Sequence, residues 1–489
     1  MNATSQTDRS RWLALYVLCL GVLMIVLDAT IVNVALPDIQ DDLGFSQSSL
    51  AWVVNAYLIA FGGLLLLAGR VGDLTSRRGV FLAGLAVFTA ASLVCGLAPS
   101  QEVLIGARFV QGAGGAMTSA VVLGMIVTMF PEPREQAKAI GVYAFVASAG
   151  GSVGLVAGGV LTQAINWHWI FFVNVPIGLA TAAFALRLLA AEPRSEERQG
   201  ADVLGGALIT AALMLAVYTI VKPAAESGFG APETLALGAL ALLLAAAFVA
   251  RQATAANPLV PLRIFRSRSV SGANLIQVLS VAGMFGMFFL GSLYMERVLG
   301  YDALELGLAV LPVTLVMGTL SVRFSEPLIT RFGPRAIVIP GLALIAAGLG
   351  LFARVPVDGA YVVDILPTMV LIGAGAGLTF PALMTIAMSG ATPSDAGLAS
   401  GLVNTTVQVG GALGLAVLAT LSATRTEHLI ADGASTASAL TDGYRLAFAI
   451  AALLVVAAIV VALTVLKPDR PARQAHESQH GLELAGAEA

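Results

Sequence analysis

Charged residues are scarce in this sequence. Only 11% of the 489 residues are Asp, Glu, Lys or Arg, against about 25% in ordinary soluble domains. Hydrophobic residues make up 58%, and the mean hydropathy is +0.89. A soluble protein of this composition could not cover its surface with polar groups. The scarcity excludes a soluble globular protein and indicates a polytopic membrane protein, with lipid as the solvent for most of the chain.

Cysteine and histidine are also scarce, at two and four residues. Cys19 and Cys95 both lie in apolar runs, which favours small buried hydrophobes over a disulfide or a metal site. His476 and His480 suit a metal clip or a solvated tail, and the polar sequence around them favours the tail. Since no His, Cys and acidic cluster has catalytic spacing, the sequence predicts neither an enzyme nor a metal site, and we expect no cofactor.

Apolar runs long enough to span a bilayer recur along the chain. A hydrocarbon core about 30 Å thick needs about 20 residues of helix, and lipid leaves unpaired backbone groups without partners. The fourteen predicted spans are 12–34, 50–69, 79–98, 103–129, 137–162, 169–191, 202–221, 233–251, 269–293, 304–324, 335–354, 363–388, 397–423 and 444–466. Residues 1–11 form a short N-terminal segment, and 467–489 are predicted to be a disordered tail.

Basic residues divide unevenly between the two sides of these spans. Most of the 26 Lys and Arg residues fall on the side of the N-terminus. The other side holds only Lys222, Arg297, Arg354, Arg425 and Arg445. Because cytoplasmic loops carry the excess of Lys and Arg, both termini are predicted to be cytoplasmic, in a multi-pass protein of the cell membrane.

Two pairs of similar segments indicate an internal repeat. "GRVGDLTSRRG" (69–79) follows the second span as "SEPLITRFGPR" (325–335) follows the tenth, and "QGAGGAMT" (111–118) resembles "IGAGAGLT" (372–379). A duplication predicts six-span halves at 12–191 and 269–466, with the two spans of 202–251 inserted between them. Unrelated Gly-rich packing segments are the alternative. Repeated halves are typical of transporters that bind substrate at the repeat interface.

Five segments in order resemble the motifs of one family. They are "LDATIVNVALP" (27–37), the 69–79 segment, "RFVQGAGGA" (108–116), "GGSVGLVAGG" (150–159) and "WHWIFFVNVPIG" (167–178). Together they resemble the major facilitator superfamily and, within it, the fourteen-span drug:proton antiporters, which include bacterial multidrug efflux transporters. The resemblance covers nearly the whole chain. It implies an all-α integral membrane fold with two pseudo-symmetric six-helix bundles and two inserted central helices.

Two residues depart from the family motifs. Leu155 stands where the fifth-span motif usually has Pro, so no Pro-induced bend is expected there. Ser76 stands where the loop motif has Gly, which leaves the turn of that loop open.

Asp28 is a carboxylate within the first span. Inserting such a group costs roughly 2.5–3.5 kcal/mol, which makes it a functional candidate. Burial raises the pKa of a carboxyl group and a neighbouring cation lowers it. Such a group can exchange its proton as its access to water alternates. Arg108, at a comparable depth in the fourth span, is the expected partner in proton coupling. A fixed structural ion pair, or contact of Asp28 with outer headgroups, is the alternative.

The resemblance also assigns roles to two other groups of residues. Gly69, Asp73, Arg77 and Arg78 are expected to form a conformational latch, against the alternative of a solvated positive loop. Gly150, Gly154, Gly158 and Gly159 belong to the antiporter motif. Small residues spaced by four allow close helix approach, so we expect this face to pack against the other half and slide, or else to give static packing.

Polar residues on apolar spans are candidates for a substrate cavity, with hydrogen bonds between helices as the equal alternative. They are Asn33, Asn55, Tyr57, Gln111, Tyr143, Asn274, Gln277, Asn404 and Gln408. A cavity with few charges suits lipophilic molecules that are neutral or singly cationic.

The sequence therefore predicts a proton-driven exporter of lipophilic drugs, antibiotics or related natural products, acting as a monomer without a nucleic-acid partner. An uptake symporter or uniporter of the same fold is the first alternative, and the fifth-span motif argues against it by resemblance only. A membrane enzyme and a non-transporting sensor or scaffold are the others. Fold does not settle function.

Overall fold

The computed structural model describes residues 8–130, 132–189, 202–221, 223, 227–389 and 396–466, and within them the chain is helical and holds no strand. The first half contains α1 (Asp8–Leu43), α2 (Gln47–Leu74), α3 (Arg77–Gly96), α4 (Gln101–Met129), α5 (Pro133–Ala164), α6 (Trp169–Phe172) and α7 (Asn174–Leu188). Next come α8 (Val203–Val221), α10 (Pro232–Thr254) and the short η1 (Leu262–Arg266). The second half contains α11 (Arg268–Arg297), α12 (Ala303–Thr319), η2 (Leu320–Phe324), α13 (Ser325–Phe332), α14 (Pro334–Phe352), η3 (Tyr361–Ile365), α15 (Leu366–Ser389), α16 (Ala396–Ala431) and α17 (Thr436–Thr464).

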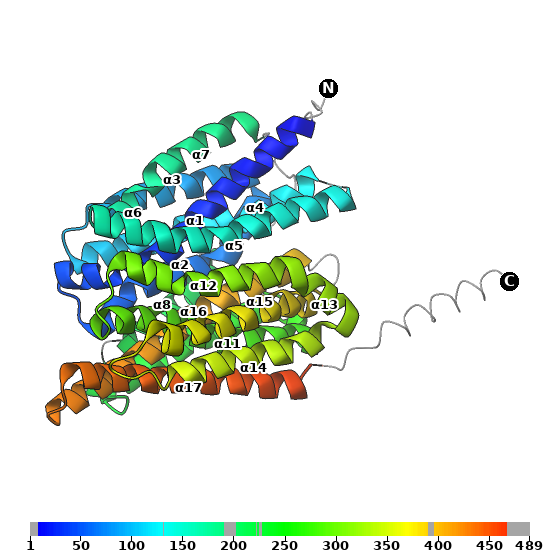
Figure 1. The fold of residues 1–489 in the computed structure, drawn as a ribbon. Helices are drawn as coiled ribbons and strands as arrows, with labels where there is room; N and C mark the ends of the chain where they lie inside the picture. Colours follow the sequence, from blue (N-terminus) through cyan, green and yellow to red (C-terminus); the bar gives the residue numbers. More distant parts are fainter. Residues whose placement is uncertain are drawn as a thin grey trace, which may run out of the picture.

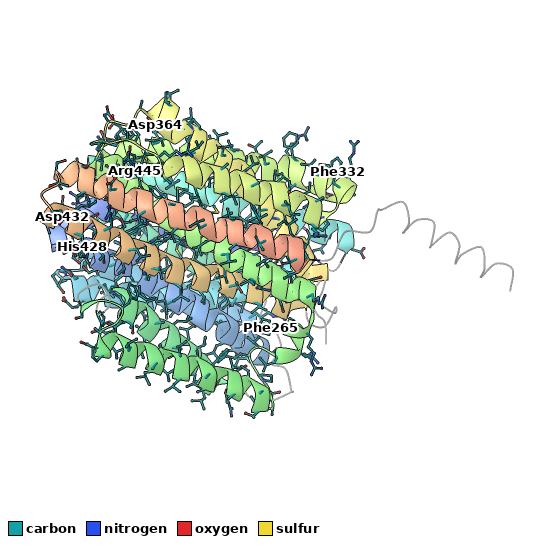
Figure 2. All side chains as sticks on the ribbon, turned by 90° about the horizontal axis from the view of Figure 1, so that it is seen from below. Phe265, Phe332, Asp364, His428, Asp432 and Arg445 are labelled. Carbon is teal, nitrogen blue, oxygen red and sulfur yellow. The ribbon has the colours of Figure 1, made fainter. Side chains whose placement is uncertain are left out.

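Within the described residues, each of the fourteen predicted spans coincides largely with helix. Twelve described helices are long and apolar enough to cross a membrane, and the apolar stretches Ser49–Leu65 of α2 and Val153–Ala164 of α5 are shorter. The helices run side by side as two bundles (Figure 1). We call the face where α1 begins and α17 ends the terminal face, and the other the opposite face. Charged Asp364, Asp432 and Arg445 lie at the opposite face, far from Phe332 at the terminal face (Figure 2).

Several helices are longer than predicted. α1 starts at Asp8 and continues through Pro37 to Leu43. The predicted loops 69–79 and 325–335 are largely helical, because α2 continues to Leu74 and α13 fills Ser325–Phe332. Ser76 accepts a hydrogen bond from the Gly79 N–H (3.1 Å) and caps α3 in extended conformation, so this turn needs no glycine. Residues 1–7, 190–201 and the predicted tail, including His476 and His480, lie outside the described residues.

The repeat is visible in how glycines pack. A Cβ on Gly112 of α4 would meet the backbone of Tyr57 on α2, and one on Gly373 of α15 would meet the backbone of Val313 on α12. On the other side of these helices, Gly114 abuts the backbone of α3 and Gly375 that of α14. The same environment at both positions reflects two pseudo-symmetric bundles, in which the absence of side chains lets helix backbones approach closely.

The two bundles meet along two seams. α2 packs against α16, and α5 packs against α12. α8 lies against both α2 and α16, and α10 packs on α8. The inserted pair therefore covers one seam from the side rather than separating the bundles.

A polar cluster joins the inserted helices to the chain that follows them. Buried Asp202 accepts hydrogen bonds from the Gly205 N–H at the start of α8, from Arg251 Nε and from Gln252 Nε2. Gln252 Oε1 in turn accepts one from the Val260 N–H. Burial raises the pKa of the Asp202 carboxyl, but these donors outweigh it, and the net result is a lowered pKa.

The glycine contacts predict a matched pair of stability changes in α4. Gly112→Ala should lower stability by about 1–3 kcal/mol, because the new methyl group meets backbone that cannot move aside. Gly106→Ala is the control, since its Cβ would have no atom within 4 Å, and it should be neutral or slightly stabilising. Thermal unfolding of the purified protein in detergent measures both, and equal melting temperatures for the two variants would contradict the packing described here.

The lowered pKa of Asp202 predicts a pH-dependent anchor for the inserted helices. Its ionised form contributes stability above the ordinary carboxyl pKa of about 3.9, and this contribution is lost as pH falls through the lower folded-state pKa. Asp202→Asn should therefore speed amide hydrogen exchange in α8 and α10 at pH 7. The difference from the wild type should shrink as pH falls below about 3.9 and vanish once pH is below the lowered folded-state pKa, and a difference that persists unchanged at acid pH would refute the charge-based explanation.

Candidate functional site

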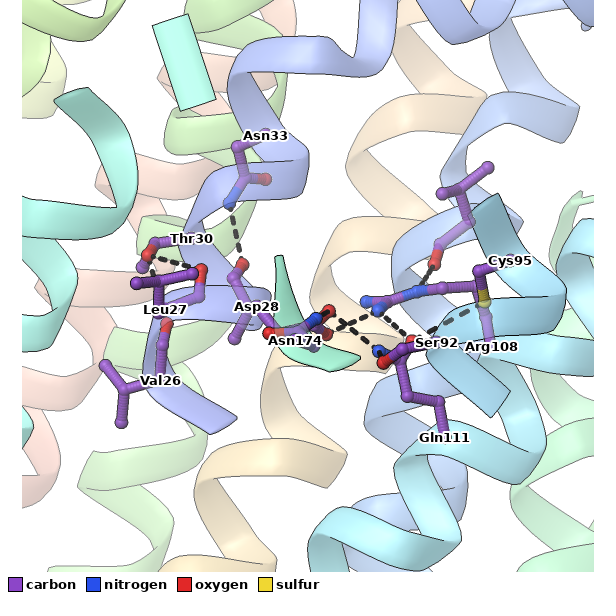
Figure 3. A network of polar contacts seen from close by, with 12 residues as sticks. Val26, Leu27, Asp28, Thr30, Asn33, Ser92, Cys95, Arg108, Gln111 and Asn174 are labelled. Atoms are coloured by element: carbon purple, nitrogen blue, oxygen red, sulfur yellow. Dashed lines mark hydrogen bonds and ion pairs between the residues drawn. The ribbon is translucent and has the colours of Figure 1, made fainter. Parts of the chain in front are cut away.

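The structure brings Asp28 of α1 and Arg108 of α4 into direct contact. Arg108 Nη1 donates to Asp28 Oδ2 at 2.6 Å (Figure 3), and the side chains of Arg108 and Asp28 are 1% and 0% exposed, respectively. The partner predicted for Asp28 is therefore present, and the alternative contact with outer headgroups does not fit a fully buried carboxylate. A buried ion pair is a weak source of net stability, whereas removing one partner costs about 3–5 kcal/mol.

Two side-chain amides complete the contacts of the carboxylate. Gln111 Nε2 donates to Asp28 Oδ1 at 2.7 Å, and Asn174 Nδ2 donates to the same oxygen at 2.8 Å. Gln111 lies one turn beyond Arg108 on α4, and this spacing places both on one helix face. Asp28 thus accepts three hydrogen bonds from two other helices, α4 and α7.

Arg108 is held by groups other than Asp28 as well. Its Nε donates to the Val53 carbonyl at 2.9 Å, and its Nη1 also contacts Gln111 Oε1 at 2.7 Å. The guanidinium lies 4.4 Å from the ring centre of Tyr57 and 5.7 Å from that of Phe171. Aromatic faces attract cations at these distances, so the arginine keeps several partners if the charge on Asp28 is neutralised.

α3 contributes two residues that bind Gln111. Gln111 Nε2 donates to Ser92 Oγ at 2.7 Å, and Cys95 Sγ donates to Gln111 Oε1 at 3.6 Å. Ser92 and Asn174 were not among the site residues predicted from the sequence. Asn174 carried a usable signal, because it is an amide in an otherwise apolar span, as Asn33 is; Ser92 carried no such signal, since isolated serines are common in membrane helices.

The candidate cavity residues divide between the network and other places. Gln111 belongs to the ion-pair network, and Tyr57 stacks on Arg108. Asn33 donates to the Ala29 carbonyl at 3.1 Å, and Asn274 binds the Val270 carbonyl and Thr406 Oγ1 at 2.8 Å each. Asn274 therefore fits the alternative of hydrogen bonds between helices, because Thr406 lies on α16, whereas the bond of Asn33 stays within α1.

The remaining candidates carry less information. Asn55 is fully buried, and neither its amide nitrogen nor its oxygen has a hydrogen-bond partner among the described residues. Gln408 lies at the α2–α16 seam, where its Cβ approaches Gly62, and its Oε1 is likewise unpartnered in the described part of the chain. Gln277 is buried in α11 and Tyr143 is half-buried in α5. Asn404 lies on α16, but its side chain is outside the described residues.

The glycine face of the antiporter motif does not pack against the other half as predicted. A Cβ on Gly150 would meet Leu23 and Val26, one on Gly154 would meet Thr30, and one on Gly158 would meet Ile31, all on α1. Gly159 is buried in the same helix. A different face of α5 meets the other half, where Gly307 of α12 abuts the Leu155 backbone. The motif therefore holds α1, which carries Asp28, close to α5.

The predicted latch residues contact their own half. Arg77 donates to Thr128 Oγ1 at 2.9 Å on α4, and Arg78 donates to the Leu186 carbonyl at 2.7 Å on α7. Gly69 packs near Ala120 of α4. Asp73 lies in the last turn of α2, and its side chain is outside the described residues.

Polar contacts between the halves lie at the opposite face in the part of the chain that the structure describes. Arg297 of α11 donates to both carboxylate oxygens of Asp41 at 2.8 and 3.1 Å, and to the Pro37 carbonyl at 3.2 Å, on α1. Gln163 of α5 donates to Asp302 at 2.9 Å. A cavity of about 230 Å³ beside Arg297 is lined by Gln40, Asp41, Leu293, Leu440 and Tyr444, and no candidate cavity residue contributes to it.

Comparison with known proteins places this chain among transporters. The Major Facilitator Superfamily pattern matches residues 18–415. The chain is 39% identical over 475 residues to the cephamycin export protein CmcT of Amycolatopsis lactamdurans, covering 96% of this chain and 94% of that protein. It is 38% identical over 460 residues to the puromycin resistance protein pur8 of Streptomyces alboniger, covering 92% and 91%, respectively.

A third relative and one solved structure agree. The multidrug resistance protein Stp of Mycobacterium tuberculosis (strain ATCC 25618 / H37Rv) is 33% identical over 427 residues, covering 86% of this chain and 79% of that protein. The crystal structure of a bacterial homologue of the human lysosomal transporter Spinster matches with a TM-score of 0.69 at 17% identity, covering 96% of this chain and 100% of that one. The chain is thus a transport protein and belongs to the Major Facilitator Superfamily.

Proposed function

We propose that this protein is a proton-coupled antiporter that exports lipophilic antibiotics or related natural products, neutral or singly cationic, across the cell membrane. The observation that carries the proposal is the buried Asp28–Arg108 pair, which joins two helices deep in the first half. The names of the relatives, which refer to cephamycin export, puromycin resistance and multidrug resistance, support the export of small antibiotics.

Proton coupling would reside in the first half. In the repeat, Arg108 corresponds to Met369, which is fully buried and carries no charge. A proton reaching Asp28 would cancel the charge attraction to Arg108, and loss of the proton would restore it. Because charged and neutral Asp28 favour different packing of α1 against α4 and α7, protonation can bias the equilibrium between two arrangements of the bundles.

We place the terminal face in the cytoplasm, following the distribution of Lys and Arg. The contacts of Arg297 and Gln163 then close the protein toward the outside. The ionised Asp28 with its three donors fits the stage after proton release to the cytoplasm, when substrate binds. Protonation from the outside, after opening of the opposite face, would favour substrate release. In the outward-open state, Arg77, Arg78 and Asp73 would serve as the latch that closes the cytoplasmic side.

Transport in sealed inside-out vesicles tests the proposal. Respiration acidifies the lumen, a pH-sensitive dye inside reports proton movement, and lipophilic cations and antibiotics including puromycin are added outside. We expect substrate-evoked proton efflux from wild-type vesicles and efflux at the background level from Asp28→Asn, which cannot take up a proton. Asp38→Asn is the matched control, because Asp38 is an exposed carboxylate on the same helix.

The outcomes separate the alternatives. Equal efflux from wild type and from correctly inserted Asp28→Asn would make Asp28 a structural residue. Efflux with none of the compounds would contradict drug:proton antiport. Substrate accumulation in right-side-out vesicles, driven by protons that enter from a more acidic exterior, would identify an uptake symporter.

Arg297→Ala should loosen the closure at the opposite face. Its ion pair with Asp41 is partly exposed, with side-chain exposures of 29% and 68%, and such pairs contribute at most about 1 kcal/mol. We therefore expect a membrane-impermeant thiol reagent to label Leu440→Cys up to roughly fivefold faster in this variant, with Cys19 and Cys95 replaced in all proteins compared.

Arg445→Ala provides the control for this experiment. Its ion pair with Asp442 has similar exposure, 36% and 39%, but lies within α17. Equal labelling in the Arg297 and Arg445 variants would show that the Arg297 contacts do not hold the halves together.

A further inference from the structure

Asn174 has a spare hydrogen-bonding group beside the ion-pair network. The side chain is fully buried, and its Nδ2 donates to Asp28 Oδ1 at 2.8 Å (Figure 3). Its Oδ1 is also buried and has no partner among the described residues. Leaving a buried acceptor unsatisfied costs free energy, so this oxygen calls for an explanation in terms of another state of the site.

Protonation of Asp28 would create a need for an acceptor. The ionised carboxylate only accepts hydrogen bonds, whereas the neutral acid also has an O–H to donate. In this structure the carboxylate faces Arg108, Gln111 and Asn174, which all donate to it. The acid form of Asp28 therefore requires one of these three side chains to accept a hydrogen bond from it instead of donating one.

Only one of the three side chains can change from donating to Asp28 to accepting from it without breaking other contacts. Arg108 has no acceptor atom. Gln111 is engaged on both sides, since its Nε2 also donates to Ser92 and its Oε1 accepts from Arg108 and Cys95. Turning the Gln111 amide would direct its NH₂ group at the Arg108 donors. Asn174, by contrast, uses its nitrogen toward Asp28 and leaves its oxygen free of described partners.

We propose that Asn174 is the positioning residue that lets Asp28 hold its proton: its amide donates to the carboxylate, and after a half-turn about its terminal bond it accepts from the carboxylic acid. The half-turn places Oδ1 where Nδ2 lies, 2.8 Å from Asp28 Oδ1, which is a normal length for an O–H···O bond. The proton then resides on Oδ1 of Asp28, while Oδ2 continues to accept from Arg108. This inference rests on the proton coupling proposed above.

The rest of the network fits this role. When Asp28 is neutral, Arg108 keeps the Val53 carbonyl, Gln111 and the Tyr57 ring as partners. The other titratable groups facing Asp28 are Tyr57 of α2 and Cys95 of α3. Asn174 is the first residue of α7, whereas Arg108 and Gln111 share α4. Rotation of the Asn174 amide therefore couples protonation of Asp28 to a third helix of the bundle.

Infrared difference spectroscopy of the reconstituted protein, recorded between high and low pH, tests this role. The probe is the C=O stretching band of the protonated Asp28, identified by its absence in Asp28→Asn. The variants Asn174→Val and Asn174→Thr differ only in a methyl group against a hydroxyl, and the hydroxyl can both donate and accept. Asn33→Val, which removes an α1 amide that binds only backbone carbonyl Ala29, controls for loss of an amide near Asp28.

We expect the Asp28 band at higher wavenumber in Asn174→Val, because the acid O–H has lost its acceptor, and near its wild-type position in Asn174→Thr and Asn33→Val. Transport should fall about tenfold in the Val variant, the effect of losing roughly 1.4 kcal/mol of hydrogen bonding to the acid form of Asp28, and recover in the Thr variant. An unshifted band in Asn174→Val would overturn the role of Asn174 alone. Absence of any Asp28-dependent band in the wild type would overturn the role and the proton coupling together. If the Val variant does not fold, the Thr variant decides. An Asp28 band in Asn174→Thr at the wavenumber of a carboxylic acid whose O–H has no acceptor would overturn the inference.

Discussion

The burial of one carboxylate beside one guanidinium is the constraint on which the first half depends. Neither Asp28 nor Arg108 reaches solvent, and either charge alone would be strongly unfavourable in a low-dielectric interior. The structure meets this requirement by bringing α1 and α4 together at the pair and by adding amide donors from α4 and α7. These helices are therefore held in register by polar contacts rather than by apolar packing alone.

The network is built so that the two charges are supported differently. Arg108 has neutral partners that do not depend on Asp28, namely the Val53 carbonyl, Gln111 and an aromatic ring. The three described partners of Asp28 are all hydrogen-bond donors. A protonation change thus acts mainly on the carboxylate side of the pair. Buried Met369 takes the place of Arg108 in the second half, so at this position pseudo-symmetry of the backbone coexists with asymmetry of the chemistry.

Packing between helices sets what can move. Glycines of α4 and α15 allow close backbone contact within each bundle, and those of the α5 motif allow α1 to lie close to α5. Between the bundles, the polar contacts of the described residues gather at the opposite face, around Arg297 and Gln163. The bundles are therefore dense units joined by fewer and more exposed interactions, which is the arrangement that permits one bundle to rock against the other.

The sequence by itself determined the fold class and the number of spans, because twenty-residue apolar runs in lipid can satisfy their backbone only as helices. It also singled out Asp28 and Arg108, because a charge in an apolar span has few structural explanations. Helix ends were predicted less well, because helices continue beyond the apolar core: α1 passes Pro37, and segments 69–79 and 325–335 are mostly helical. Ser76 caps α3, which starts two residues before the predicted span. Only the tertiary structure decided that Asn174 and Ser92 join the ion pair, that the Gly150–Gly158 face packs on α1 rather than on the other half, and that Arg297 closes the opposite face. These facts depend on how each helix is rotated and which helix lies beside it. Residues far apart in sequence set that arrangement, and the periodicity of a single span does not contain it.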